Sequence, residues 1–377
     1  MAVPEDAGAE WLDGNPHQAG LASRAGPASP ASGEAKPDPA AAEVVNPNSY
    51  PAASPATSTA SGEVRPAHPA LRADLPGKRG GEPFFYGGQA VIEGVMMRGK
   101  SHYAVAVRLP TTKEIVVDRG ELKAPIYTHP IWKAPFVRGL ALIGEQLHLG
   151  MKSLIWSANM NAGSNNIEIG KKEITGSVAM ADVFALVLFI GLPLFLAGLA
   201  VHRSGSFAFV LVEGVIRVGL VLGYLAAISL LPDVRRVFQY HGAEHKTINA
   251  FESGWALDVP SVRRASTLHP RCGTGFLLVV LVVSVIVFSI VALFHPNLFW
   301  LVASRVLAIP LIAGTGFELI RFMARHRYHP IVKIALLPVL GTQKFTTREP
   351  ADDMLEVAIC AFNSAREGEE ATAGAAA

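Results

Sequence analysis

Two histidines and a glutamate near the middle of the chain have the residue types and the spacing of a metal site. His241 and His245 are four positions apart. On a helix both side chains would lie on one face, about 6 Å apart along the axis. Glu244 directly precedes the second histidine, and this order, H-x-x-E-H, is the inverted form of the zinc peptidase motif, in which the carboxylate is the general base. The motif predicts a zinc site with a hydrolytic role for Glu244.

A second pair of ligand-type residues follows, with His269 and Cys272 three positions apart. Imidazole and thiolate together suit zinc, so we predict that His241, His245, His269 and Cys272 bind one zinc ion. A closed site with four protein ligands is usually structural. If one of the four stays off the metal, a water can take its place and Glu244 can deprotonate it.

Two further carboxylates are candidates for the third ligand. Glu252 falls on the same helical stripe as His245, but about 10 Å along the axis, too far to share one ion unless the helix breaks. Glu318 lies far downstream, as the third ligand does in inverted-motif peptidases, and it stays an alternative. An ion pair with Arg321 or Arg325 explains Glu318 equally well.

For the whole cluster, the alternative is a set of histidines at the membrane surface that form hydrogen bonds and hold no metal.

The composition is that of a polytopic membrane protein. The 377 residues are 50% hydrophobic and 17% charged, which is too apolar for a pair of soluble domains. The net charge of +2, with Lys and Arg mostly at the ends of apolar segments, gives no argument for nucleic-acid binding. Two cysteines, Cys272 and Cys360, imply no disulfide framework and are compatible with a reducing compartment. The acidic first residues lack an apolar core, so no cleavable signal peptide is expected.

Four apolar segments are each long enough to cross about 30 Å of hydrocarbon. The second contains Glu213 and Arg217, and the fourth contains Arg305 and Glu318. Glu213 and Arg217 are spaced to pair on one helix face, which is the least costly way to keep charge in lipid. The predicted spans are 183–201, 207–231, 275–294 and 298–320.

Basic residues gather before the first span, between the second and third spans, and after the fourth. The two other connections contain almost none. The positive-inside rule therefore places both termini and residues 232–274 in the cytoplasm.

The rest of the chain divides by composition and periodicity. An Ala- and Pro-rich start without apolar period predicts a disordered tail, and a Gly-bounded alternating stretch predicts a small β unit. A helical apolar pattern with interspersed charge predicts an amphipathic helix, and the short apolar stretch 331–340 predicts an interfacial or re-entrant segment. The predicted parts are 1–80 (tail), 84–120 (β unit), 136–157 (amphipathic helix), 183–231 (first two spans), 232–274 (metal-site loop), 275–320 (last two spans) and 331–366 (C-terminal region).

Four ordered motifs between Phe84 and Phe362 resemble the YqhQ-like bacterial family. They are GGQAVIEGVMMRG at 87–99, FQYHGAEHKT at 238–247, HPRCGT at 269–274 and TTREP at 346–350. The resemblance implies an integral membrane protein of bacterial origin and a metal-dependent enzyme of uncharacterised function. One departure is visible, because residues 338–343 read PVLGTQ where the family commonly has a PGLWLQ-like sequence. This difference concerns the shape of that turn and not the family.

We therefore predict a mainly α-helical, four-span bundle in the bacterial inner (cytoplasmic) membrane, with a small cytosolic β unit and amphipathic interfacial helices. The first functional hypothesis is a zinc-dependent hydrolase at the cytoplasmic face, acting on a peptide or a lipid-linked substrate. The second is a non-enzymatic scaffold or assembly protein with a structural metal site. The third is a transporter that uses Glu213, Arg217, Arg305 and Glu318. The lipid bilayer is the expected partner, and assembly into a homo-oligomer is left open.

Overall fold

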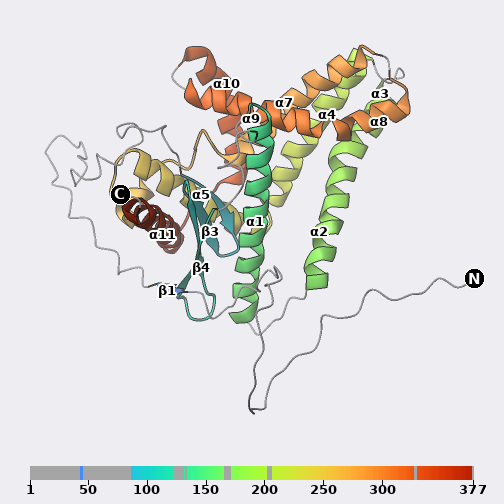
Figure 1. The fold of residues 1–377 in the computed structure, drawn as a ribbon. Coiled ribbons are helices and arrows are strands. Elements are labelled where there is room, and N and C mark those ends of the chain that lie inside the picture. Colours follow the sequence, from blue (N-terminus) through green and yellow to red (C-terminus); the bar gives the residue numbers. More distant parts are fainter. Residues whose placement is uncertain are drawn as a thin grey trace, which may run out of the picture. The chain divides into compact units, whose positions relative to one another are not determined.

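The computed structural model describes residues 43–45, 86–122, 131, 134–164, 171–201, 206–294, 296–326 and 329–375 (Figure 1). All of them lie in the unit Pro39–Ala377. Apart from residues 43–45, the predicted tail at 1–80 lies outside the described part of the chain.

The predicted β unit is an antiparallel sheet with the strand order β1-β5-β4-β3-β2. Four strands come from the predicted segment, and one comes from the region that we assigned to the tail. That strand pairs Val44 with Val116 of β5. The predicted tail therefore contributes one strand of three residues, which is too short to show a period in the sequence. The strands are β1 (Glu43–Val45), β2 (Gly87–Val91), β3 (Gly94–Arg98), β4 (His102–Arg108) and β5 (Ile115–Glu121).

Alternation along the strands gives the sheet two apolar faces. Val95 and Ala104 lie in one core with residues of helices α5 (Pro232–Glu252) and α11 (Asp352–Ala375). On the other face, Met96 and Val105 pack with residues of helix α1 (Val137–Ser164). The sheet is therefore covered by helices on both sides (Figure 1), and α5 is fixed against it.

Within the described residues, three helices are long and apolar enough to cross a membrane, or up to four if one bent pair counts as a single span. The first runs through α2 (Lys171–Leu186), the π-helix η6 (Val187–Gly191) and α3 (Leu192–Ala200). The others are α4 (Phe207–Ile228) and α7 (Gly273–Ala292). The bent pair is α8 (Leu298–Leu307) with α9 (Ile309–Arg325), and the bend between the two helices is 43°. The apolar helices of the described chain thus indicate a helical membrane protein. That it has four spans stays a prediction.

The predicted ion pair of Glu213 with Arg217 is confirmed, and Arg305 of α8 joins it. All three side chains are buried. Both guanidinium groups also lie over the ring of Phe288 on α7. The Cζ atom of Arg305 is 4.4 Å from the centre of this ring. The Nε of Arg217 donates to the carbonyl of Phe189 in the π-helix, at 3.0 Å. This cluster links all four candidate membrane segments.

Candidate metal site

Helix α5 carries the histidine motif, and its sequence defines both of its ends. It begins at Pro232, where a proline costs no hydrogen bond, and Asp233 lies in the favourable first turn. It ends at Glu252, and Gly254 follows with φ of 71°, the left-handed conformation that commonly ends a helix. The predicted metal-site loop at 232–274 is therefore mostly helix, completed by the short helix α6 (Val259–Arg263).

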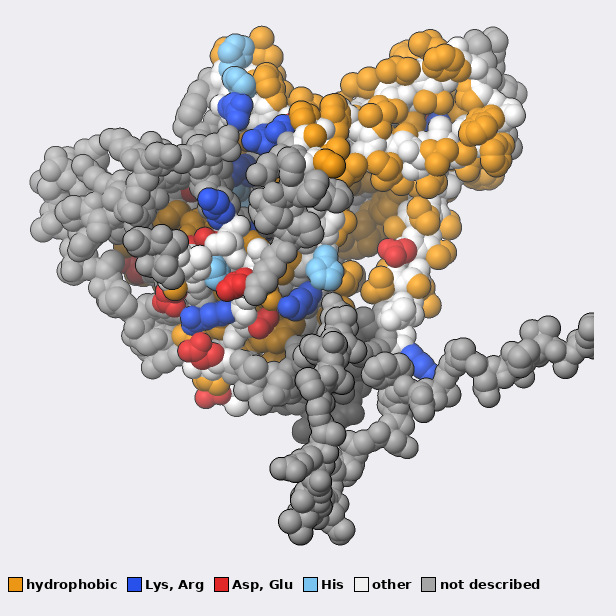
Figure 2. All heavy atoms as spheres, in the orientation of Figure 1, with side chains coloured by type: hydrophobic (Ala, Val, Ile, Leu, Met, Phe, Trp, Pro, Cys, Tyr) orange, Lys and Arg blue, Asp and Glu red, His pale blue; other side chains and the backbone are white. Residues whose placement is uncertain are grey.

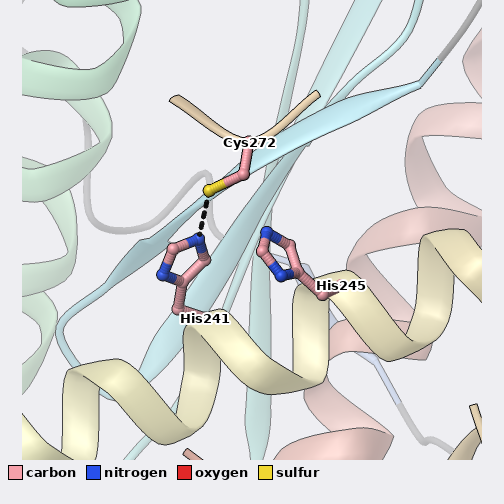
Figure 3. A group of neighbouring side chains, drawn as sticks. All are labelled: His241, His245 and Cys272. Atoms are coloured by element: carbon pink, nitrogen blue, oxygen red, sulfur yellow. Dashed lines mark hydrogen bonds between the residues drawn. The ribbon is translucent and has the colours of Figure 1, made fainter. Parts of the chain in front are cut away.

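Three of the four predicted ligands meet. The ligand atoms of His241, His245 and Cys272 all lie within 4.8 Å of one another. Figure 3 shows the two imidazoles rising from adjacent turns of α5 toward the thiol. Cys272 is the N-cap residue of α7, so it lies where a candidate span begins. We refer to these three residues as the metal-site trio.

Both imidazoles are oriented by backbone carbonyls. Nδ1 of His241 lies 2.8 Å from the carbonyl oxygen of Thr346, and Nδ1 of His245 lies 2.5 Å from that of Thr267. Because a carbonyl only accepts, each Nδ1 carries a proton, and in a neutral imidazole of this tautomer the lone pair that can bind a metal is on Nε2. Histidines that bind metals are commonly held in this way. The Nε2 of His241 lies 3.2 Å from Sγ of Cys272.

The carboxylate of Glu244 lies beside the trio. Its Oε2 is 3.9 Å from Nε2 of His241, and only 4% of the residue is exposed. Burial raises the pKa of Glu244 to about 7, although His241 and a hydrogen bond from the Gly88 amide favour its ionised form. A Cβ atom at Gly88 would lie 2.8 Å from Cγ of Glu244. The glycine therefore lets strand β2 approach the carboxylate.

His269 is not part of the trio, so its place in the predicted set of four ligands stays a prediction. Its ring centre is 5.5 Å from that of His245, and its Nε2 lies 4.0 Å from a carboxylate oxygen of Glu252. Glu252 also pairs with Arg271. Neither His269 nor Glu252 belongs to the trio.

Gln343, which the sequence analysis did not single out, fixes the backbone of His269. Its side-chain oxygen accepts from the His269 amide at 2.9 Å, and its side-chain nitrogen donates to the His269 carbonyl at 2.7 Å. Gln343 is fully buried and belongs to α10 (Pro330–Thr346). This double hydrogen bond holds the segment that leads to Cys272. No local sequence pattern predicts this contact, because Gln343 and His269 are 74 positions apart.

The alternative ligand Glu318 lies elsewhere. It forms an ion pair with Arg138 of α1, whose Nε lies 2.7 Å from Oε1. The alternative to metal binding was an ion pair with Arg321 or Arg325, whereas this guanidinium comes from a helix 180 positions earlier. Glu318 is therefore not part of the cluster of Glu213, Arg217 and Arg305. The four charged residues considered for transport do not form one cluster.

The segment after α10 packs closely on α5. A Cβ atom at Gly242 would lie 2.1 Å from the carbonyl oxygen of Arg348, so only glycine fits there. The Arg348 amide donates to the carbonyl of Phe238 at 2.9 Å. Glu349 pairs with the buried Lys246, whose ammonium also donates to two carbonyls at the end of α6 and just after it. These contacts hold α5 in place beside the trio.

The four sequence motifs meet around this site. Gly88 of the first contacts Glu244 of the second, and Cys272 of the third faces His241. The carbonyl of Thr346, from the fourth, orients His241. Segments spread over most of the described chain therefore build one centre.

Comparisons with known proteins identify the family of this chain. Residues 134–368 match the family model described as "Protein of unknown function (DUF1385)". The "Uncharacterized protein YqhQ" of Bacillus subtilis (strain 168) is 36% identical over 296 residues, which cover 74% of this chain and 92% of that relative. No solved structure gives a significant match. The chain therefore belongs to the DUF1385 family of proteins of unknown function.

Proposed function

We propose that the chain is a zinc-dependent hydrolase whose metal ligands are His241, His245 and Cys272. The observation that carries the proposal is the convergence of the three donor atoms within 4.8 Å, with both imidazoles oriented by carbonyls. The proposed enzyme works at a membrane surface, because the trio lies at the beginning of the candidate span α7.

The donor set fits zinc better than other common metals. Two imidazole nitrogens and one thiolate are typical zinc ligands, whereas magnesium and calcium prefer oxygen. Three protein ligands are also the usual number in a catalytic zinc site, which keeps one position for water or substrate. The trio has this number.

Glu244 is the proposed general base. When bound, zinc acts as a Lewis acid that polarises a substrate carbonyl or phosphoryl group and makes water more acidic. The carboxylate of Glu244 lies 3.9 Å from Nε2 of His241 and accepts a hydrogen bond from the backbone amide of Gly88. It can therefore accept a proton beside the trio while Gly88 keeps it in position.

We place this site at the cytoplasmic face of the bacterial inner membrane. Helix α4 ends at Ile228 and α5 begins at Pro232, and α7 begins immediately after Cys272. The site thus lies at the same end of two candidate spans. The connecting segment is rich in Lys and Arg, which favours the cytoplasm. With four spans, both termini are cytoplasmic too.

Metal analysis of the purified full-length protein, together with Glu244→Gln, tests the proposal. We expect about one zinc per chain in both proteins, because Glu244 is not a ligand. Against a panel of peptide and lipid-linked ester substrates, turnover should fall at least about 100-fold in E244Q, as expected for loss of a general base. Glu114→Gln, at an exposed position, is the matched control. A chain that folds but binds no zinc would overturn the proposal.

A structural metal site in a non-enzymatic scaffold is the second candidate. It is favoured by the burial of His245 and Cys272, which are 1% and 7% exposed, because a closed site that joins α5 to α7 would look the same. In that case E244Q has no phenotype, and His245→Ala loosens the packing of α5 against the turn before α7. Amide hydrogen exchange of the two variants separates this function from the first.

Gln343 should matter for metal affinity although it is not a ligand. Gln343→Ala removes both hydrogen bonds to the backbone of His269, so the turn that carries Cys272 loses its support. We expect zinc to bind about 10- to 100-fold more weakly, the usual cost of losing an outer support. Competition with a zinc chelator measures the change. The exposed neighbour Lys344→Gln is the control and should bind zinc like the unmodified protein.

A further inference from the structure

Helix α10 presents an apolar stripe on its exposed side. Ile331, Ile334 and Leu337 are 70%, 68% and 64% exposed. On the opposite side, Val332 and Leu336 are buried in the core of the helical bundle. The first half of α10 is therefore apolar on both sides. Aliphatic side chains gathered in this way on a surface indicate a contact with another apolar phase.

The stretch of sequence that contains this stripe is basic. No Asp or Glu occurs between residues 319 and 348. Arg325 and Lys333 are exposed on either side of the turn into α10. Figure 2 shows hydrophobic, basic and histidine side chains together over α10, at the top of the view. The Lys and Arg residues of the segment are Arg321, Arg325, Arg327, Lys333, Lys344 and Arg348.

We propose that the first half of α10, from Pro330 to Leu337, docks on anionic phospholipid at the membrane surface. An aliphatic stripe flanked by Lys and Arg is the pattern of helices that lie in the headgroup region. Each Lys or Arg near such a surface adds attraction to negatively charged headgroups. Lipid is the fitting occupant because α10 begins a few residues after α9, the second half of a candidate span.

The same helix supports the metal-site trio at its other end. Gln343 holds the backbone of His269, and the carbonyl of Thr346 orients His241. Lipid contact and metal-site support therefore lie on one helix, about three turns apart. Docking of α10 does not require a metal, so its test is independent of the proposed hydrolase activity.

Photo-crosslinking of the full-length protein in lipid nanodiscs tests the docking. A benzoylphenylalanine replaces Ile334 in one protein and Leu337 in a second, and Glu114 in a control at the exposed sheet hairpin. The nanodiscs contain phosphatidylglycerol and phosphatidylcholine in known proportion. Mass spectrometry then identifies each adduct. We expect lipid adducts from Ile334 and Leu337, with phosphatidylglycerol enriched about threefold over its bulk share, and none from Glu114.

The double variant R325Q/K333Q should return the adducts at Ile334 to the bulk lipid ratio while lipid crosslinking persists. Adducts with a second protein chain, adducts at the bulk ratio in the unmodified background, or no lipid adduct at either position would each overturn the proposal. Zinc content measured on the same samples stays unchanged if only the lipid contact is lost.

Discussion

Replacing Cys272 with serine is expected to weaken zinc binding by more than about 100-fold. Loss of an outer support alone costs about 10- to 100-fold in metal affinity, and Cys272 is one of only three ligand candidates that meet in the described chain. Serine keeps the size of the side chain but removes the soft thiolate that favours zinc. The hydrogen bond between Sγ and Thr274 can be formed by a hydroxyl as well, so the fold should persist.

Cobalt(II) substitution gives this prediction a spectroscopic measurement. The unmodified protein should show a thiolate-to-cobalt charge-transfer band, and C272S should show none. Cys360→Ser is the matched control, because Cys360 is buried in α11 and lies outside the trio. A band that persists in C272S but disappears in C360S would remove Cys272 from the site, and the proposed ligand set with it.

The sequence predicts the centre of this site better than its surroundings. His241 and His245 could be placed together because a helix fixes the relation of positions four apart. Cys272 could be added from its chemistry. His269 has equally suitable chemistry but lies outside the trio, and its backbone is held by the buried Gln343, a partner 74 positions away. The spacing of residues in the sequence does not predict such long-range contacts.

The fold shows the same division between local and distant information. Alternating strands and long apolar helices follow from local periodicity, so the sheet and the candidate spans were predicted. The bend between α8 and α9 was not, although Pro310 stands at the start of α9. The π-helix Val187–Gly191 carries no charge or proline that would reveal it. The carbonyl of Phe189 within it accepts from Arg217, so a contact between helices accompanies this irregularity.

Removing the charge of Glu213 should be the most destabilising single change among the candidate spans. Glu213 is 1% exposed and is the carboxylate that pairs with both Arg217 and Arg305. Glu213→Gln leaves two buried guanidinium groups without a counter-charge. Breaking a buried ion pair from one side costs about 3 to 5 kcal/mol. We expect the free energy of unfolding to fall by about this amount, and the melting temperature in detergent to fall by about 10 °C.

Replacing the whole cluster tests whether its charges have only a packing role. In the triple variant Glu213→Leu, Arg217→Leu and Arg305→Met, no unpaired charge remains, and apolar substitutes for a buried ion cluster are often neutral or stabilising. Recovery of the melting temperature, with zinc content unchanged, would show that the cluster serves packing of the spans. A triple variant that melts normally but loses the proposed hydrolase activity would instead connect the charges to function. If E213Q melts like the unmodified protein, the buried cluster contributes little to stability, contrary to our expectation.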